Sequence, residues 1–304
     1  MNAVAEDNTS FIDLPEVRGK YRLNADLSGT NWFRVGGAAD VLFRPADAED
    51  LAQFLRHKPA DMPVTLLGVG SNIIVRDGGI DGVVIKLGRG FTQLQVDGDV
   101  LEAGAANLSL NAALFAAEQG RAGLEFLSGI PGTIGGALAM NAGAYGDETA
   151  DCLIEAEVVT GRGEIKRVSV DELGYSYRHC SAPADCVFTR GFFRTREGAR
   201  EAIKARIAEI QAQREASQPI RTRTGGSTFK NPDGKKAWEV IDAAGCRGMM
   251  VGEAKMSEKH CNFMENTGNA SAADLEALGE QVKQKVKAHC GVDLQWEIKR
   301  IGKP

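Results

Sequence analysis

The sequence has no apolar run that approaches the ~18 residues of a membrane helix. Its first residues, MNAVAEDNTSFIDLP, contain neither the basic segment nor the apolar core of a secretion signal. We therefore expect a cytoplasmic protein that does not interact with a membrane.

The sequence also has no excess of positive charge. It contains 36 Lys and Arg residues and 41 Asp and Glu residues, so the formal net charge is −5. A surface that holds a nucleic acid backbone or an anionic membrane is therefore not expected. A few local Arg and Lys side chains can still bind an anionic small molecule, so that class of partner stays open. Nothing in the composition requires an oligomer.

The cysteines and histidines lack the usual redox and metal-binding spacings, and no CxxC pair occurs. We predict reduced, mostly buried thiols and no metal site. The residues concerned are Cys152, Cys180, Cys186, Cys246, Cys261 and Cys290, and His57, His179, His260 and His289.

Glycine is the residue in excess, at 36 of 304 residues, which is about 12% against a usual ~7%. The glycines are clustered, which indicates segments of tight backbone. The 43% hydrophobic and 25% charged residues are typical of a soluble globular protein. The length exceeds the roughly 100–200 residues of one domain, so two or three units are expected.

Hydrophobic periodicity predicts a mixed α/β protein. We predict units at residues 20–95, 96–199 and 200–304, after a loose polar arm at residues 1–19. Helices are predicted at residues 47–56, 109–119 with Ser109 as its cap and Leu114 on its apolar face, 197–216, 238–244 and 271–290. Strands are predicted at residues 40–43, 64–69, 83–87, 94–96, 100–103, 152–160, 164–170, 186–195, 248–252, 262–266 and 294–301, with a loop at residues 220–234.

The first glycine loop, LLGVGSN at residues 66–72, directly follows an apolar strand. Glycines in such a turn let backbone N–H groups approach a phosphate, and Ser71 and Asn72 can add side-chain hydrogen bonds. Ile73 stands where the third glycine of a G-x-G-x-x-G fingerprint would fall, so a Rossmann dinucleotide site is not supported. Taken alone, the loop is equally well explained as a tight structural turn.

The second glycine stretch has six glycines within residues 129–146, with Pro131 between them. Such a stretch is predicted to be neither a strand nor a helix interior, because each glycine there would cost ~1 kcal/mol relative to alanine. We expect a pyrophosphate against this backbone, with a purely structural turn as the alternative. Together the loops predict FAD bound without a Rossmann fingerprint, through Gly68, Gly70, Ser71, Asn72, Gly129, Pro131, Gly132, Thr133, Gly135, Gly136, Asn141 and Gly143.

Five motifs, in order along residues 30–302, give the sequence a specific resemblance. They are LLGVGSN, GLEFLSGIPGTIGGALAMNAGAYGDE (123–148), SYR (176–178), GGSTFKNP (225–232) and WEIKRIG (296–302). The set resembles the UDP-N-acetylenolpyruvoylglucosamine reductase (MurB) family. The resemblance implies a two-lobed FAD-binding fold of the vanillyl-alcohol oxidase-like type with a C-terminal α/β substrate domain. The compact stretch after Pro232 resembles the second subtype of the family, which lacks an inserted tyrosine loop.

The resemblance implies an NADPH-dependent reduction of an enolpyruvyl sugar nucleotide to UDP-N-acetylmuramate for peptidoglycan, with FAD as the hydride carrier. It also implies three catalytic residues: Arg178 on the substrate carboxylate, Ser227 as proton donor, and Glu297 acting with Arg178. Taken alone, such an arginine, serine or glutamate is more often a surface or structural residue.

Further positions follow from the same motifs. Tyr177, Lys230 and Asn231 are implied to contact substrate, and Lys299 stands where related sequences often carry an arginine near the flavin. Lysine keeps the charge but loses the bidentate geometry. Arg223 and His179 are left without an assigned role. We expect non-covalent FAD, because neither matched glycine loop contains His or Cys.

Two rival functions stay open. One is an FAD oxidase or dehydrogenase of a small alcohol on the same fold. The other is a nucleotide-binding regulatory module that performs no chemistry. The combination of Arg178, Ser227 and Glu297 favours the reductase over the module.

Overall fold

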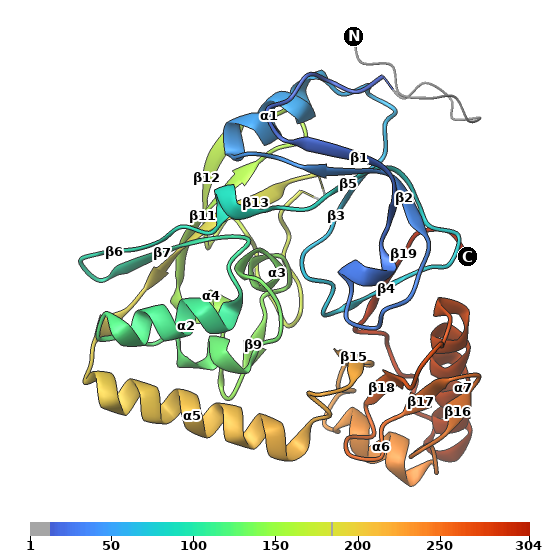
Figure 1. The fold of residues 1–304 in the computed structure, drawn as a ribbon. Helices are drawn as coiled ribbons and strands as arrows, with labels where there is room; N and C mark the ends of the chain where they lie inside the picture. The colour runs from blue at the N-terminus through green and yellow to red at the C-terminus, as the bar shows by residue number, and fades with distance from the viewer. Residues whose placement is uncertain (1–12, 184) are drawn as a thin grey trace.

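The first lobe of the protein is built on a four-stranded sheet (Figure 1). A computed structural model describes residues 13–183 and 185–304 of the chain. The strand order is β1-β2-β5-β3, in which β1 runs antiparallel to β2 while β2, β5 and β3 are parallel. The elements of this lobe are β1 (Lys20–Asp26), η1 (Ser28–Thr30), β2 (Ala38–Arg44), α1 (Ala48–His57), β3 (Val64–Leu66), β4 (Ile73–Val75), β5 (Ile80–Ile85) and η2 (Arg89–Phe91).

Helix α1 covers one face of this sheet. Its N-cap Asp47 accepts a hydrogen bond from the Asp50 backbone N–H at 3.0 Å, which satisfies one free amide of the first turn. Leu51 and Phe54 then pack against Phe43 of the sheet. Alternating strand residues build a second core on the opposite face, so the sheet is buried on both sides.

The segment before β1 is docked rather than loose. The backbone N–H groups of Arg18 and Gly19 donate to the Asp50 carboxylate at 2.6 and 2.9 Å, and Leu14 and Val17 pack beside the first-lobe core. The predicted loose arm is therefore wrong for this part, because Asp50 provides a buried acceptor that sequence patterning does not show. The rest of that arm, residues 1–12, lies outside the described residues.

The second lobe contains a five-stranded antiparallel sheet of order β12-β11-β13-β7-β6. The short helices α2, α3 and η3 pack on this sheet around Leu127, Leu138 and Phe193. The elements are β6 (Leu94–Asp97), β7 (Val100–Gly104), α2 (Ser109–Glu118), β8 (Arg121–Ala122), η3 (Glu125–Gly129), α3 (Ile134–Met140), β9 (Gly143–Ala144), β10 (Asp147–Glu148), α4 (Thr149–Cys152), β11 (Leu153–Val159), β12 (Ile165–Ser169), β13 (Val187–Arg194) and β14 (Arg196–Glu197).

Two local predictions in this lobe are wrong. Ser109 does not cap α2, because the N-cap is Leu108 and the buried Ser109 hydroxyl has no hydrogen-bond partner among the described residues. Leu114 is 41% exposed, since the buried face of α2 consists mainly of alanines instead. In addition, Gly135 and Gly136 lie in the first turn of α3, although a helix was not predicted there.

The long helix α5 (Arg200–Ser217) belongs by its packing to the second lobe. Ile203 and Ile207 join the core of that lobe, and Figure 1 shows α5 running beneath α2 toward the third unit. The predicted third unit begins at residue 200, whereas this packing places the change of unit after Ser217.

The third unit is a four-stranded antiparallel sheet of order β15-β18-β17-β16 beside α6 and α7. Helix α7 begins with a capping box between Ser271 and Asp274 and ends at Gly291 in the left-handed conformation, as the sequence signals predict. The elements are β15 (Arg223–Ser227), α6 (Ala237–Ala243), β16 (Met250–Val251), β17 (Ala254–Met256), β18 (Phe263–Asn266), α7 (Ala272–Cys290) and β19 (Lys299–Ile301). Strand β15 occupies part of the predicted loop at residues 220–234.

The end of the chain returns to the first lobe. Strand β19 pairs with β4 in parallel, and the backbone N–H of Arg76 donates to the Ile301 carbonyl at 2.9 Å. This pairing holds the third unit against the glycine loop that precedes β4. None of the helices in the described parts of the chain is long and apolar enough to cross a membrane.

Candidate active site

The two predicted glycine loops meet. The Ser71 hydroxyl donates to the Pro131 carbonyl at 2.9 Å. A Cβ placed on Gly132 would lie 3.1 Å from that hydroxyl oxygen, and one placed on Gly68 would lie 3.4 Å from Oγ1 of Thr133. A side chain at Gly132 would therefore crowd the contact between the loops, whereas a Cβ at Gly68 would make an ordinary contact with Thr133.

The contact leaves a cluster of backbone donors without partners. Gly70 and Gly132 have positive φ angles of 69° and 146°, which turn the chain sharply at this point. A group of free backbone N–H donors where two turns meet is suited to bind an anion. Within the described residues, no protein acceptor is found for the N–H groups of Gly68, Val69, Gly70, Ser71, Asn72, Gly132 and Thr133.

Three other predicted cofactor residues face protein instead. A Cβ on Gly129 would lie 2.3 Å from the Tyr145 ring, and one on Gly143 would lie 2.7 Å from Cβ of Glu148. The Gly135 N–H donates to the Ala105 carbonyl at 2.9 Å. These glycines therefore permit close packing within the second lobe. Gly136 has more space, because its nearest neighbour, Oγ1 of Thr133, would lie 3.6 Å from a Cβ.

Asn141 is a structural link and not an exposed ligand. It is fully buried, with a left-handed φ of 46°. Its amide nitrogen donates to the Ser176 carbonyl at 3.2 Å, and its amide oxygen accepts from the Ala150 N–H at 2.9 Å. Asn141 thus connects the second glycine stretch to the SYR motif, a role that its position in the sequence does not show.

The SYR motif forms a tight turn that presents Arg178. Ser176 and His179 exchange two backbone hydrogen bonds, and Arg178 has a φ of 55°. The Arg178 guanidinium carbon lies 5.4 Å from the centre of the Tyr177 ring, which is a cation–π distance. The Tyr177 side chain is itself mostly exposed.

Arg178 pairs with Glu297 from the other end of the chain. Nε of Arg178 donates to Oε1 of Glu297 at 3.0 Å, with only 22% and 13% of the two side chains exposed. Burial raises the pKa of the Glu297 carboxyl above its usual range, although Arg178 and Lys230 act against that shift. The pair therefore combines a shielded guanidinium with a carboxyl that holds a proton more readily than an exposed one.

Ser227 lies at the end of β15, next to a residue that contacts the Glu297 backbone. The carbonyl of the next residue, Thr228, accepts a hydrogen bond from the Glu297 N–H at 2.9 Å. A Cβ on Gly226, which has a φ of 78°, would lie 3.9 Å from the Ser71 carbonyl. The structure thus brings Ser227 and Glu297 together at the edge of the first glycine loop.

Asn72 joins the glycine loop to the segment that contains Glu297, just before β19. Its amide nitrogen donates to the Glu297 carbonyl at 3.3 Å, and its own carbonyl accepts from the Lys299 N–H at 3.1 Å. Lys299 is therefore fixed next to the loop through its backbone, while its side chain is exposed.

The remaining predicted residues lie at the margin of the site. Lys230 acts on the Glu297 carboxyl through its charge. Asn231 is exposed, and its side-chain oxygen accepts from the first N–H of α6, at Ala237. Arg223 donates to the Gly268 carbonyl at 2.7 Å, and the His179 ring lies 3.3 Å from the Ser181 hydroxyl.

The described residues contain no cluster of three His, Cys, Asp or Glu side chains suited to a metal. The six cysteines are free thiols, and burial raises the pKa of the Cys152 thiol to about 12. Neither observation adds redox or metal chemistry to the site.

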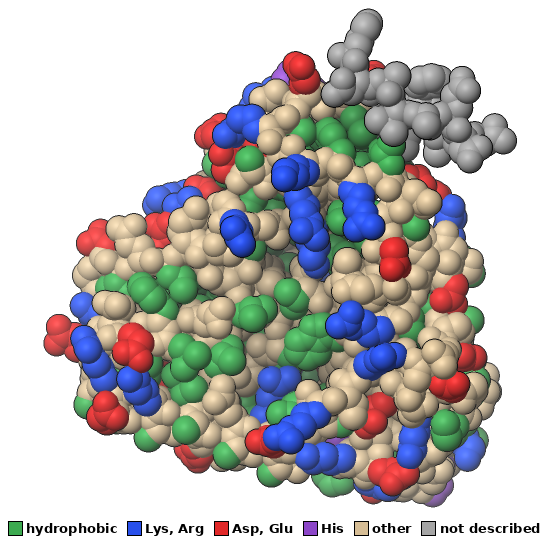
Figure 2. All heavy atoms as spheres, viewed as in Figure 1, with side chains coloured by type: hydrophobic (Ala, Val, Ile, Leu, Met, Phe, Trp, Pro, Cys, Tyr) green, Lys and Arg blue, Asp and Glu red, His purple; other side chains and the backbone are tan. Residues whose placement is uncertain are grey.

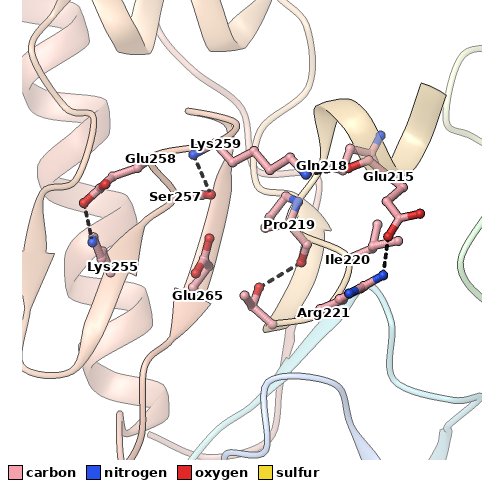
Figure 3. A pocket seen from close by; sticks show the side chains of 11 residues that line it. Glu215, Gln218, Pro219, Ile220, Arg221, Lys255, Ser257, Glu258, Lys259 and Glu265 are labelled. Carbon is pink, nitrogen blue, oxygen red and sulfur yellow. Dashed lines mark hydrogen bonds and ion pairs between the residues drawn. The ribbon is translucent and has the colours of Figure 1, made fainter. Parts of the chain in front are cut away.

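A separate pocket of about 480 Å³ lies where the segment after α5 meets β17 and β18 (Figure 3). Arg221 pairs with Glu215 and Lys255 pairs with Glu258, while Lys259 donates to the Glu215 carbonyl. Each Lys and Arg among its described lining residues is thus already engaged, and the three predicted catalytic residues do not line it.

The comparisons with known proteins identify the class first. Residues 39–169 match a family model described as an FAD binding domain, so the two lobes are those of a flavoprotein. Residues 218–301 match the model described as UDP-N-acetylenolpyruvoylglucosamine reductase, C-terminal domain. The second match begins where α5 ends.

Relatives and a solved structure then identify the family. The chain is 58% identical over 297 residues to the UDP-N-acetylenolpyruvoylglucosamine reductase of Gluconobacter oxydans, covering 97% of each chain. It is 55% identical over 299 residues to that of Parvibaculum lavamentivorans, covering 98% of this chain and 96% of the relative. The crystal structure of the Thermus caldophilus reductase (MurB) aligns with a TM-score of 0.82 at 33% identity, covering 94% of this chain and 100% of that one.

The chain belongs to the UDP-N-acetylenolpyruvoylglucosamine reductase family, and it is an FAD-dependent oxidoreductase. The family resemblance, the fold class and the FAD cofactor predicted from the sequence are confirmed.

Proposed function

We propose that this protein reduces UDP-N-acetylenolpyruvoylglucosamine to UDP-N-acetylmuramate in peptidoglycan precursor synthesis, with NADPH as reductant and FAD as cofactor. The observation that supports this most directly is the convergence of Arg178, Glu297 and Ser227 at the edge of the first glycine loop. We also propose that the reaction takes place in the cytoplasm.

The free amides of the two glycine loops fit the diphosphate of FAD. Gly68, Gly70, Ser71, Asn72, Gly132 and Thr133 would hold it, because their N–H groups have no acceptor among the described residues. When bound, FAD accepts a hydride from NADPH and supplies a hydride to the carbon–carbon double bond of the substrate. The absence of His and Cys from both loops favours non-covalent binding, so acid denaturation should release the flavin from the polypeptide.

Arg178 is suited to bind the substrate carboxylate. Addition of a hydride to the distal carbon of an enolpyruvyl group moves negative charge into the carboxylate, which becomes an enediolate. A partly buried guanidinium stabilises that charge more strongly than an exposed one would. The turn at Ser176 and the amide of Asn141 fix the position of this guanidinium.

Glu297 orients Arg178 through the 3.0 Å hydrogen bond. Its raised pKa allows the Glu297 carboxyl to share a proton with the substrate carboxylate. Two fully ionised carboxylates at close range would instead repel each other.

Ser227 would then deliver a proton to the carbon that carries the ether oxygen, which completes the addition of one hydride and one proton. Gly225 and Gly226 precede it, and Gly225 packs so closely on Phe33 that a Cβ would lie 2.3 Å from that ring. The hydroxyl is thus presented on a tight turn next to the segment that contains Glu297. We propose substrate contacts for Tyr177, Lys230 and Asn231, and a flavin contact for Lys299.

An anaerobic flavin spectrum tests the proposal. NADPH should bleach the flavin band, the enolpyruvyl sugar nucleotide should restore it, and mass spectrometry should show a product heavier by two hydrogens. Indifference to NADPH, together with rapid reaction of the reduced flavin with oxygen, would instead identify an alcohol oxidase. A flavin that neither compound affects would identify a binding module.

A further inference from the structure

Two cationic side chains lie at the carboxyl edge of the parallel strands in the first lobe. In β2, β5 and β3, Phe43 pairs with Ile85 and Ile85 pairs with Leu66, so the three strands end together. Arg44 is the last residue of β2, and Lys86 directly follows β5. In open α/β sheets, ligands bind at the carboxyl ends of the strands.

Lys86 is attached to the first glycine loop. Its ammonium donates to the carbonyl of Gly68. Gly68 is the first of the successive loop residues whose N–H groups lack acceptors. One of the three donors of the ammonium is used in this bond, and no further acceptor for the ammonium is found among the described residues. The ammonium therefore lies beside the cluster of free backbone donors.

The charges of Lys86 and Arg44 are not neutralised by protein. No Asp or Glu of the described chain lies within ion-pair distance of either side chain. Burial, with a smaller contribution from the nearby Arg44 guanidinium, lowers the pKa of the Lys86 ammonium to about 8. By contrast, Arg76 and Arg190, which are also partly buried, have carboxylate partners.

Two neighbouring cations beside a cluster of free N–H donors form an electrostatically unfavourable arrangement unless an anion occupies it. Figure 2 shows Lys and Arg side chains gathered around a hollow in the middle of one face, which agrees with an anionic ligand at the meeting point of the units.

We propose that Lys86 and Arg44 bind a phosphate group of one of the two dinucleotides that the reaction uses, beside the first glycine loop. This inference rests on the proposed function, because that function supplies two dinucleotides. The phosphate belongs either to the diphosphate of FAD or to the 2′-phosphate of NADPH.

The test uses Lys86→Gln and Arg44→Gln, with Arg22→Gln as the matched control. Arg22 is exposed on β1 of the same sheet, and its side chain makes no hydrogen bond among the described residues. The dissociation constant of FAD is measured by fluorescence titration of flavin-free protein. The ratio of kcat/KM values for NADPH and NADH is measured with the reconstituted enzyme. Lys86→Arg, which keeps the charge, should behave more like the wild type than Lys86→Gln.

If the phosphate is that of FAD, each charge-removing variant weakens FAD binding by about tenfold to a hundredfold, as expected for a lost charge-assisted hydrogen bond. If it is the 2′-phosphate, FAD binding is unchanged and the preference for NADPH over NADH falls by a similar factor. The inference is overturned if both variants match Arg22→Gln in both measurements.

Urea unfolding of the flavin-free proteins shows whether Lys86→Gln folds. If it does not, the exposed Arg44→Gln alone decides. A wild-type protein that binds FAD but fails the reduction of the sugar nucleotide would contradict the proposed function while leaving the FAD measurement interpretable.

Discussion

Nε of Arg178 donates to Oε1 of Glu297 at 3.0 Å, although the two residues are 119 positions apart in the chain. The pair joins the second lobe to the last strand segment, and most of it is shielded from water. The pKa of the Glu297 carboxyl should therefore respond to single substitutions of nearby charged residues.

Lys230→Met should raise the pKa of Glu297 further, because the Lys230 ammonium favours the ionised carboxylate. The native pKa already lies above that of the unfolded chain, so the native state binds more protons and stability falls as pH rises from about 4.5 through the native pKa. In Lys230→Met, this loss of stability should continue to a higher pH than in the wild type. Carbon NMR of labelled glutamate across a pH series measures the pKa directly, and urea unfolding at the same pH values measures the stability.

Lys235→Met is the control for that titration, because Lys235 is exposed and is not among the groups that shift Glu297. A Glu297 pKa that is the same in the wild type and in Lys230→Met would contradict the prediction.

Ser227→Ala should separate the two half-reactions. Protonation of the substrate is not needed when NADPH reduces the flavin, so that step should stay within roughly tenfold of the wild type. Reoxidation by the enolpyruvyl substrate should slow by about 10²–10⁴-fold, as expected for a lost general acid. Stopped-flow absorbance of the flavin follows each step separately.

Ser217→Ala, at the exposed end of α5, should leave both steps unchanged. Equal slowing of both steps in Ser227→Ala would indicate a disturbed flavin site. Normal reoxidation would remove Ser227 from the mechanism.

Asn141→Ala should impair catalysis more than flavin binding. It removes one of the two donors to the Ser176 carbonyl and leaves the Ala150 N–H without its acceptor, which costs about 1–3 kcal/mol of unfolding free energy. Turnover should fall because the turn that presents Arg178 loses its anchor. Asn24→Ala is the control, since Asn24 has nearly the same φ of 44° but is exposed. Equal effects of the two substitutions would show that only backbone strain matters.

Gly135→Val and Gly136→Val should affect different properties. A Cβ on Gly135 would lie 3.0 Å from Cβ of Ala105, so valine should lower the unfolding free energy of the flavin-free protein by about 1–3 kcal/mol. Valine at Gly136 has room within the protein and should change that stability by no more than ~0.5 kcal/mol while weakening FAD binding. Urea unfolding and FAD titration distinguish the two. Identical results in both measurements would contradict this division.

The elements that the sequence predicted well are those specified by nearby residues. The ends of helix α7 (Ala272–Cys290) were predictable because its cap residues, Ser271 and Gly291, directly adjoin it in the sequence. Strand β15 was missed because Gly225 and Gly226 have low strand propensity, and it forms only through pairing with β18. The extent of β19 is likewise set by its distant partner β4.

The residues of the candidate site also divide into those that local motifs predicted and those that depend on contacts between distant parts of the chain. The family motifs predicted catalytic roles for Arg178, Ser227 and Glu297. The structure pairs Arg178 with Glu297 and places Ser227 next to Thr228, whose carbonyl accepts from the Glu297 N–H. The link made by Asn141 and the support that the Thr228 carbonyl gives Glu297 were not predicted, because each depends on a hydrogen bond between residues far apart in the sequence. Lys86 carries no sequence signal either, since its significance comes from the edge where three parallel strands end.

The pairing of β19 with β4 has a consequence for how the protein is made. The hydrogen bond from the Asn72 amide to the Glu297 carbonyl can form only after Glu297, 225 residues further along the chain, has been synthesised. On the ribosome, the N-terminal lobe therefore emerges with the edge next to its glycine loop uncovered, and that edge is completed only after β19 has also emerged. Cofactor capture should accordingly be a late event in folding, and a chain that stops short of Lys299 should be a poor flavin acceptor even when both lobes have been fully synthesised.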